Sequence, residues 1–487
     1  MKCNPSVYEI NTRVWIKRFG VKSLNEIPNS YWADLRNKGI DYVWLMGVWK
    51  TCDSIIEKYC FEEGLVKSYE RALKDWKKED IIGSPFAIDN YKVNPSLGGN
   101  EALAELREKL KQNKLGLILD FIPNHYSVGS SLLKSNPEIF LEVSKENFER
   151  DSHTYFKSDD EEKYFAHGRD PFFPAWLDTA QVNYFEKTAR KFQTDVLLKL
   201  TDVCDGVRCD MAMLMLNNVF RNTWAGAFSE TNYEIPTGEF WKEAIDRVKN
   251  IRSDYLFIAE AYWDLEWELQ QLGFDFTYDK KLTDRIRFGN VFSVRDHLRA
   301  EEDYQKKSVR FLENHDETRA FAALGKDREK AAAVIISTIQ GLRFYHDGQF
   351  EGKKIRLPVQ LGREPFETVR EDIKIFYDNL LSIAQKDIFK LGAWQMLDAE
   401  QSWEGNNTFT NLLIWQWTYE KEKCVVIINY SDIVSTCRLK LDVSNYPDEF
   451  EIKDLLNDTT YIRFAEEVYH SGLYIELKPW HSHIFSY

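Results

Sequence analysis

Eight short apolar runs, separated in most places by helix-like segments, constrain the fold of this 487-residue chain more than any other feature. Each run is rich in Val, Ile, Leu or aromatic residues and is bounded by charged or turn residues, as expected of strands buried on both faces. Alternating strands and helices predict an α/β fold with a parallel sheet, and eight such units predict closure into a (β/α)8 barrel. The runs are VYEI near Val7, DYVWLM from Asp41, LGLILDF from Leu115, DGVRCDM from Asp205, YLFIAEAY from Tyr255, GFDFTYD from Gly273, SVRFLENHD from Ser308 and GLRFYHDG from Gly341.

The segments between several of these runs carry apolar residues at helical spacing. Asn100 is the predicted cap of ALAELREKLKQN, a helix that ends before the third run. Three further helices are predicted over residues 183–200, 239–250 and 328–340, ahead of the fourth, fifth and eighth runs.

Two insertions and one change of pattern interrupt this alternation. Residues 50–83, between the second and third runs, are mostly charged and helical in pattern. Residues from about 126 to 181 have few periodic runs and many aromatic residues, which predicts a loop subdomain on the C-terminal face of the barrel. From about Gly392, short and partly alternating runs predict an antiparallel β-sandwich. We therefore expect a barrel over residues 1–390 and a β-sandwich domain over residues 391–487.

The composition excludes several classes of protein. A formal charge of -14 argues against a nucleic-acid partner, because phosphate binding needs a basic surface. Seven cysteines without a C-x-x-C pair predict neither a disulfide framework nor a structural zinc site. The opening MKCNPSVYEINTRVW has no apolar signal segment, and no stretch approaches the roughly 18 apolar residues of a membrane span. We expect a cytoplasmic protein without a membrane partner, and these features leave the oligomeric state open.

Acidic residues stand at the C-terminal ends of four of the predicted strands: Asp120, Asp210, Glu260 and Asp316. In a barrel this is the face where active sites gather. Any one of these acids alone is most simply a capping or turn residue. Four that converge are costly to place for structural reasons, because neighbouring carboxylates repel one another. Glycoside hydrolysis uses such a cluster, with one carboxylate at the anomeric carbon and a second, protonated one at the leaving oxygen.

At these residues the chain resembles the α-amylase family of retaining glycoside hydrolases, and the resemblance covers essentially the whole sequence. It implies a TIM (β/α)8 barrel, an inserted loop subdomain, a C-terminal antiparallel β-domain and an α-linked oligosaccharide or polysaccharide substrate. DFIPNH (120–125), GVRCD (206–210), IAEAYW (258–263) and ENHDETR (313–319) are similar to the four short stretches typical of the family, in order, while SPFAIDNYKVNPSLGG and AQVNYF (180–185) resemble two further ones.

The resemblance implies a role for each of the three principal carboxylates. Asp210 is the expected nucleophile, Glu260 the general acid/base, and Asp316 the carboxylate that stabilises the transition state. Arg208 lies two residues before Asp210, so on a strand both side chains share one face, where the guanidinium would keep Asp210 ionised. The alternative for Arg208 is an ordinary salt bridge of the barrel.

The resemblance also implies the residues that contact the sugar. His125 and His315 are expected to hydrogen-bond its hydroxyls, and Asp120 is expected to orient its neighbours. Phe86 stands where many members stack a tyrosine on the cleaved sugar. Arg319 either reaches the same subsite or pairs with Asp316 or Glu317. Among the rim candidates, Trp263 is the expected stacking residue, whereas Trp49 and Trp176 fit the core equally well.

This sequence departs from the family pattern at two places. Many members carry a Lys-His pair after the nucleophile, and this chain has Met211 to Leu214 there, which predicts few contacts to the sugars beyond the cut. The usual calcium-binding aspartate aligns with Gln181, and a hard cation prefers charged oxygen ligands to the amide of Asn124 alone. We therefore expect no metal and no cofactor, and a preference for short soluble α-glucosides over granular starch.

Other functions remain open at this point. A glucanotransferase or a disaccharide isomerase would use the same carboxylates, because transfer differs from hydrolysis only in the attacking hydroxyl. A non-enzymatic binding subunit would be signalled by loss of the carboxylates, and all three are present. The segment RLPVQLGR (356–363) is distinctive, and the sequence assigns it no role.

Overall fold

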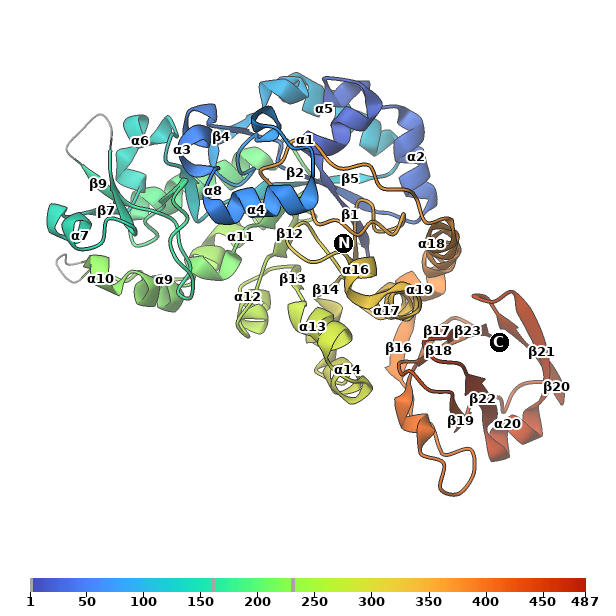
Figure 1. Ribbon diagram of the computed structural model, residues 1–487. Helices are drawn as coiled ribbons and strands as arrows, with labels where there is room; N and C mark the ends of the chain where they lie inside the picture. The colour runs from blue at the N-terminus through green and yellow to red at the C-terminus, as the bar shows by residue number, and fades with distance from the viewer. Residues whose placement is uncertain (1–2, 159–162, 229–232) are drawn as a thin grey trace.

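The eight predicted strands form a closed parallel barrel in the computed structural model, which describes residues 3–158, 163–228 and 233–487. The order around the barrel is β1-β15-β14-β13-β12-β11-β5-β2, so the fold prediction is confirmed (Figure 1). The barrel strands are β1 (Ser6–Asn11), β2 (Tyr42–Met46), β5 (Gly116–Phe121), β11 (Gly206–Cys209), β12 (Leu256–Ala259), β13 (Phe276–Tyr278), β14 (Ser308–Arg310) and β15 (Leu342–His346).

Helices surround the barrel because the strands are apolar on both faces and must be covered. The four helices predicted from periodicity are α5 (Gly99–Gln112), α8 (Lys187–Leu200), α11 (Phe240–Ile251) and α17 (Lys326–Thr338). The others in the described part of the barrel domain are α1 (Thr12–Trp15), α2 (Asn29–Asn37), α9 (Asn217–Thr223), α10 (Ala225–Phe228), α12 (Glu266–Gln271), α13 (Lys280–Phe288), α14 (Val291–Leu298), α15 (Glu302–Lys306), α16 (Ala320–Leu324), α18 (Glu371–Ala384) and α19 (Asp387–Leu391).

The predicted cap of α5 was wrong. The capping position is Gly98, whose φ of 91° lies in the left-handed region that glycine tolerates. Asn100 lies one residue inside the helix, and its side-chain oxygen accepts a hydrogen bond from the backbone N–H of Val93 at 2.9 Å. The asparagine therefore ties the helix to the preceding strand rather than capping it.

Both insertions emerge at the C-terminal ends of barrel strands. The first, here called the β2 insertion (residues 50–83), contains α3 (Ile56–Tyr59) and α4 (Glu63–Ala72) and lies between β3 (Trp49–Thr51) and β4 (Ile88–Val93). The second contains α6 (Leu132–Ser135), α7 (Lys145–Arg150), a pair β6 (His125–Ser127) and β10 (Thr179–Gln181), and a small sheet of β7 (Glu142–Val143), β8 (Tyr155–Lys157) and β9 (Tyr164–Ala166).

An antiparallel β-domain follows the barrel and packs beside it (orange to red in Figure 1). Its six-stranded sheet runs in the order β16-β17-β18-β23-β20-β21, and β19 pairs with β22. Three of these strands, β16, β20 and β21, were not predicted from the sequence. The elements are β16 (Ala393–Met396), β17 (Leu412–Tyr419), β18 (Glu422–Asn429), β19 (Ser435–Leu439), β20 (Glu449–Asp454), β21 (Thr459–Phe464), α20 (Ala465–Ser471), β22 (Leu473–Leu477) and β23 (Ser482–Ser486).

Two features bear on the environment of the protein. All seven cysteines are free thiols, and five of them are buried. Within the described residues, no helix combines the length and the apolar character that crossing a bilayer requires.

The contact between the two domains gives the first testable prediction. Trp417 of β17 is 1% exposed, and its indole N–H donates to the carbonyl of Thr338 at the end of α17 at 2.6 Å. Trp417→Ala removes a large buried side chain and leaves that carbonyl unpaired, so we expect a loss of about 3–5 kcal/mol in stability. The matched control is Trp403→Ala, because Trp403 is 55% exposed and should change stability by about 0.5 kcal/mol or less. Urea unfolding midpoints measure both, and equal midpoints would contradict this role for Trp417.

Candidate active site

The strand-end carboxylates converge on one buried arginine. Arg208 of β11 places Nη1 2.6 Å from Oδ1 of Asp210 and Nη2 2.7 Å from Oε2 of Glu260. The same Nη1 lies 3.9 Å from Oδ1 of Asp120. Asp210 directly follows β11, Glu260 directly follows β12, and Asp120 is the fifth residue of β5. Because these three strands are neighbours in the barrel, one guanidinium can reach an acid from each of them.

The register of the strands explains this placement. Arg208 pairs with Asp120 across the β11–β5 ladder, and side chains alternate along a strand, so Arg208 and Asp210 lie on the same side. Three aromatic rings enclose the guanidinium, those of Trp44, Phe86 and Tyr278, whose centroids lie 5.1, 5.4 and 5.7 Å from Cζ. Such rings exclude water and favour a cation over their faces. Arg208 is only 1% exposed, so its charge acts on the carboxylates with little screening.

Burial and mutual repulsion raise the pKa of both acids that contact Arg208. Burial raises the pKa of Glu260, and the charges of Asp210 and Asp316 raise it further, while Arg208 lowers it. Burial also raises the pKa of Asp210, but Arg208 opposes this through both its charge and a direct hydrogen bond. Two adjacent buried carboxylates disfavour double ionisation. The site therefore favours a single proton between Asp210 and Glu260.

Asp120 is held by the strand next to it. Its carboxylate accepts hydrogen bonds from the indole N–H of Trp44 at 3.1 Å and from the backbone N–H of Gly47 at 3.0 Å. Burial raises the pKa of Asp120 to about 7, although Arg208 lowers it. Trp49, which the sequence placed in either the core or the rim, is 1% exposed and donates to the carbonyl of Asp120 at 2.7 Å. Trp49 is therefore a core residue that positions the end of β5.

His315 joins Asp316 to the first strand of the barrel. Its Nδ1 lies 2.5 Å from Oε1 of Glu9, and its Nε2 lies 3.0 Å from Oδ2 of Asp316. Burial opposes protonation of His315, but the two carboxylates outweigh it and raise its pKa well above the usual value. The ring of Phe86 stacks on His315 with a centroid distance of 5.3 Å. Asp316 itself has a side chain 53% exposed, so its carboxylate faces open space above the cluster.

His125 and two tryptophans lie on the other side of the site. Burial lowers the pKa of His125 to about 4, so at neutral pH it is an uncharged donor and acceptor. The half-buried ring of Trp176 lies 5.3 Å from it. Trp263, three residues after Glu260, has a φ of 64°, and Asp264 has one of 66°. These left-handed backbone positions are unusual for such residues, and they turn Trp263 against Phe172, with ring centroids 4.9 Å apart.

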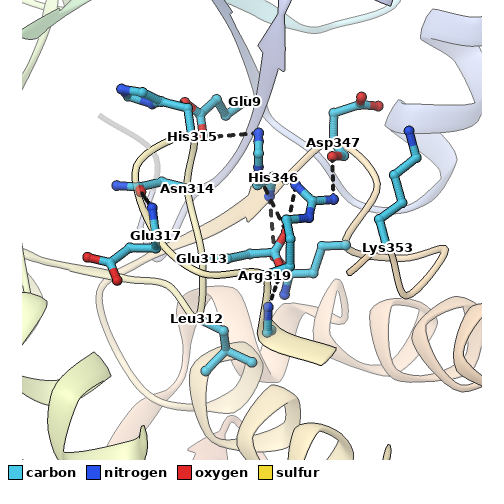
Figure 2. A network of polar contacts seen from close by, with 12 residues as sticks. Glu9, Leu312, Glu313, Asn314, His315, Glu317, Arg319, His346, Asp347 and Lys353 are labelled. Atoms are coloured by element: carbon cyan, nitrogen blue, oxygen red, sulfur yellow. Dashed lines mark hydrogen bonds and ion pairs between the residues drawn. The ribbon is translucent and has the colours of Figure 1, made fainter. Parts of the chain in front are cut away.

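Arg319 does not make the pair that the sequence suggested. Its Nη1 lies 3.0 Å from Glu313, and its Nη2 donates to the carbonyl of Asp347 at 2.8 Å. Figure 2 shows Arg319 between Glu313 and Asp347, with His346 beside it. Glu317 instead pairs with Arg287 at 2.6 Å. The prediction of a pair with Asp316 or Glu317 was wrong, because the loop after β14 turns the arginine toward β15.

Trp44 and Tyr278, which contact Arg208, were not predicted from the sequence, and neither were Glu9 and Tyr262. Glu9 holds His315, and the hydroxyl of Tyr262 donates to Oε1 of Glu260 at 2.8 Å. A signal for each exists. Glu9 is a carboxylate inside an otherwise apolar strand, and such a group is kept only where it has a partner. Tyr262 follows Glu260 by two residues.

Gln181, which aligns with the usual calcium-binding aspartate, uses its side-chain amide to hydrogen-bond the neighbouring oxygens. Its Nε2 donates to the side-chain oxygen of Asn124 at 2.9 Å, to the backbone carbonyl of Asn124 at 3.0 Å and to that of Val182 at 3.0 Å. Calcium is bound by converging oxygen atoms, several of them charged. Here the converging oxygens already accept N–H bonds, so the residues present do not fit a calcium ion.

Comparison with known proteins shows similarity along most of the chain. The family model of the α-amylase catalytic domain matches residues 85–364, more than half of the sequence. The chain is 22% identical to α-amylase 3 of Dictyoglomus thermophilum over 430 residues, which is 78% of each protein. The structure is similar to that of the maltogenic α-amylase AmyB from Thermotoga neapolitana, with a TM-score of 0.69, 18% identity and coverage of 99% and 98% of the two chains. The structure of an α-amylase from Lactobacillus plantarum is similar with a TM-score of 0.67 and 18% identity, and the match covers 99% of each chain.

The geometry around Gln181 gives the second prediction. Extensive chelation should leave the melting temperature of the protein unchanged, because the oxygens of Asn124 and Val182 already accept hydrogen bonds from the Gln181 amide. Gln181→Asp replaces the N–H donor by a carboxylate among the same oxygens, so added calcium should raise the melting temperature of this variant through binding to the folded state. Gln181→Glu is the matched control, because glutamate is as long as glutamine and puts a carboxylate oxygen where Nε2 now lies, which leaves no space for an ion. A wild-type protein that loses stability on chelation and regains it only with calcium would overturn this prediction.

Proposed function

This chain belongs to the α-amylase family of glycoside hydrolases, and we propose that it hydrolyses α-glucosidic bonds of malto-oligosaccharides by a retaining double displacement. The observation that carries the proposal is the sharing of Arg208 by Asp210 and Glu260. Two carboxylates on one guanidinium must be close together. That fits the spacing of about 5–5.5 Å in retaining sites better than the about 6.5–9.5 Å of inverting ones. Two relatives in sequence, from Dictyoglomus thermophilum and Haloarcula japonica, are both named α-amylases, which supports an α-glucan substrate.

In the first step Asp210 is the nucleophile. Its carboxylate attacks the anomeric carbon while Glu260 gives its proton to the oxygen of the leaving sugar, so one C–O bond forms as the other breaks. Arg208 favours the ionised form of Asp210, and burial and the neighbouring carboxylates favour the protonated form of Glu260. The hydroxyl of Tyr262 and the backbone N–H of Met211 orient the Glu260 carboxyl.

In the second step Glu260, now ionised, takes a proton from water. The hydroxide formed attacks the same anomeric carbon, Asp210 leaves, and the original configuration returns. Asp316 stays ionised because His315 lowers its pKa to about 2, although desolvation opposes this. Its negative charge lies where the oxocarbenium-like transition state is positive, which is the kind of stabilisation that a preorganised charge provides.

The sugar-binding residues support a compact site for the cleaved unit. Phe86 offers a ring face beside Arg208, while His125 and the His315–Asp316 pair offer polar atoms on either side. Beyond the cut, residues 212–215 are buried and apolar, so they offer no charged pair to a long acceptor. These observations favour short, soluble α-glucosides.

We also infer that the protein works in a reducing compartment. Burial raises the pKa of four cysteine thiols, those of Cys60, Cys204, Cys424 and Cys437, to about 11 or higher. Such thiols are poor nucleophiles and are kept for packing. A chain with seven free thiols is typical of the cytoplasm.

The third prediction separates the roles of the carboxylates. Glu260→Gln should lower kcat on maltotriose by about 10²–10⁴-fold, because proton transfer to the leaving sugar is lost. On 4-nitrophenyl α-glucoside the first step needs no proton, so the variant should release a rapid burst of nitrophenol and then turn over slowly. Asp210→Asn should lose both phases, and Asp316→Asn should lose kcat on both substrates.

Glu404→Gln is the matched control for these variants, since Glu404 is exposed and far along the chain in the C-terminal domain. Circular dichroism must show that each variant is folded. A folded Asp210→Asn protein with near-normal activity would refute the assignment of the nucleophile.

The fourth prediction concerns stereochemistry. Two successive displacements at one carbon restore its configuration, so the sugar first released should be the α-anomer. Proton NMR of fresh product, recorded before mutarotation, distinguishes the anomers. An initial β-anomer would show single displacement and contradict the role of Asp210.

A further inference from the structure

The segment RLPVQLGR lies in a long connection between β15 and α18, here called the strap (residues 348–364). The strap leaves the C-terminal end of β15, on the same face of the barrel as the carboxylates. It contains no regular helix or strand, yet it is fixed along its length by contacts to other segments. These contacts decide what the strap does.

The β2 insertion holds the far end of the strap. Backbone hydrogen bonds join Ile82 to Gln360 at 2.9 Å and Gly362 to Asp80 at 2.7 Å. Arg363 donates two hydrogen bonds to the carboxylate of Asp80, at 2.8 and 2.9 Å. Leu361 is fully buried in an apolar cluster with Cys60, Tyr69, Leu73 and Ile81. Strap and β2 insertion therefore form one packed unit.

The segment after β1 and the loop after β14, here called the catalytic loop because it carries Asp316, hold the rest of the strap. Arg13 donates to the carbonyl of Val359 at 3.0 Å, and Arg18 forms ion pairs with Asp347 at the base of the strap and with Glu364 at its end. Arg356 reaches the catalytic loop, where it donates to the backbone carbonyl of Asp316 at 2.6 Å. The strap thus stands against Asp316 and His315.

This position lies across the barrel from the acid/base. Glu260 follows β12, and β12 is four strands from β1 in either direction around the closed barrel. The strap and its supports leave β15, β1 and β2, the strands on that opposite side. Because Glu260 protonates the leaving sugar, the leaving sugar lies on the β12 side. The strap therefore borders the part of the site that holds the glycone, the sugar retained on Asp210.

Little space remains behind the glycone. The cavity between the strap and His315 has a volume of about 40 Å³ and is lined by Arg18, Asp347, Lys353, Leu357 and Glu364 among others. That is room for roughly three water molecules, and a glucosyl unit is several times larger. Ion pairs among its lining residues, such as Lys353 with Glu364 at 2.7 Å, hold the walls together.

The opposite side of the site carries exposed aromatic rings. Phe172 and Phe173 are 67% and 65% exposed, and Phe172 lies against Trp263 beside the acid/base. Exposed rings of this kind suit the apolar faces of sugars leaving the site. Residues 212–215 offer no charged pair to the sugars on the leaving-group side, so these rings are the contacts available to a chain there, while the strap stops the chain on the glycone side.

We infer that the strap, braced by the β2 insertion, makes this enzyme exo-acting, so that it removes short units from the non-reducing ends of α-glucan chains. This inference rests on the proposed hydrolysis at Asp210 and Glu260. It assigns the sequence RLPVQLGR a role in specificity. Chains whose non-reducing end is blocked cannot enter, and interior bonds of a polymer are not cut.

The test compares two maltohexaosides that differ only at the non-reducing end, one free and one blocked by a 4,6-ethylidene acetal. The free substrate should be hydrolysed with a single short product at first, and the blocked one should react about 100-fold or more slowly in kcat/KM. In soluble starch, reducing ends should accumulate while the viscosity falls only slowly, because cleavage from the chain ends leaves most of each chain intact. Comparable cleavage of both hexaosides would overturn the inference and leave the proposed function intact. Cleavage of neither would refute the proposed function, and the inference with it.

A strap variant tests whether this segment is the cause. The double variant Leu361→Ala, Arg363→Ala removes the buried anchor and the ion pair to Asp80, so discrimination between the two hexaosides should fall by about tenfold or more. The ratio of two rates on one preparation does not depend on the folded fraction. Arg438→Ala, which removes an arginine paired with Glu467 in the C-terminal domain, is the matched control and should keep the full ratio. An unchanged ratio in the strap variant, shown to be folded, would overturn the role of the strap.

Discussion

The buried guanidinium of Arg208 is the interaction on which the active site depends. Ionised carboxylates are costly to bury unless a partner and hydrogen bonds compensate them, and three carboxyl groups meet here. Arg208 contacts Asp210 and Glu260 directly and lies 3.9 Å from Asp120. The three strands that carry these acids are neighbours in the barrel, so the barrel itself positions the acids around Arg208. Removing Arg208 would leave uncompensated charge among the rings of Trp44, Phe86 and Tyr278.

A second ion cluster lies on the opposite side of the barrel and serves a different purpose. The ion pair between Glu9 and His315 joins β1 to the loop after β14. Arg319 joins Glu313 of the same loop to the backbone of Asp347 (Figure 2). The Arg18–Asp347 pair continues this network to the base of the strap. The loops after β14, β15 and β1 are thereby linked into one wall. The leaving-group side, in contrast, is built from aromatic rings on separate loops, and some of these rings are exposed.

The parts of the fold that were predicted correctly are those with a strong local signal. All eight barrel strands were found because both of their faces are buried and their apolar runs are nearly continuous. β20 was missed because EFEIKD alternates charged and apolar residues at the surface of a small sheet, which leaves only two large apolar side chains inside. The cap of α5 was assigned to Asn100 on propensity, but glycine takes a left-handed backbone more easily, and the asparagine found a partner in β4.

The sequence by itself determined the barrel, the positions of the four acids at strand ends, and the pairing of Arg208 with Asp210, because period and spacing along one strand fix which side chains share a face. Only the tertiary structure decided which charges meet across the barrel. Glu9 reaches His315 over 306 positions of the chain, and the strap meets the β2 insertion from a comparable distance. Such contacts depend on how loops from different strands fold over one face, and loop paths follow from packing against one another rather than from any local pattern. The carboxylates could therefore be predicted from the sequence, whereas the strap and its contacts to the β2 insertion could be identified only in the tertiary structure.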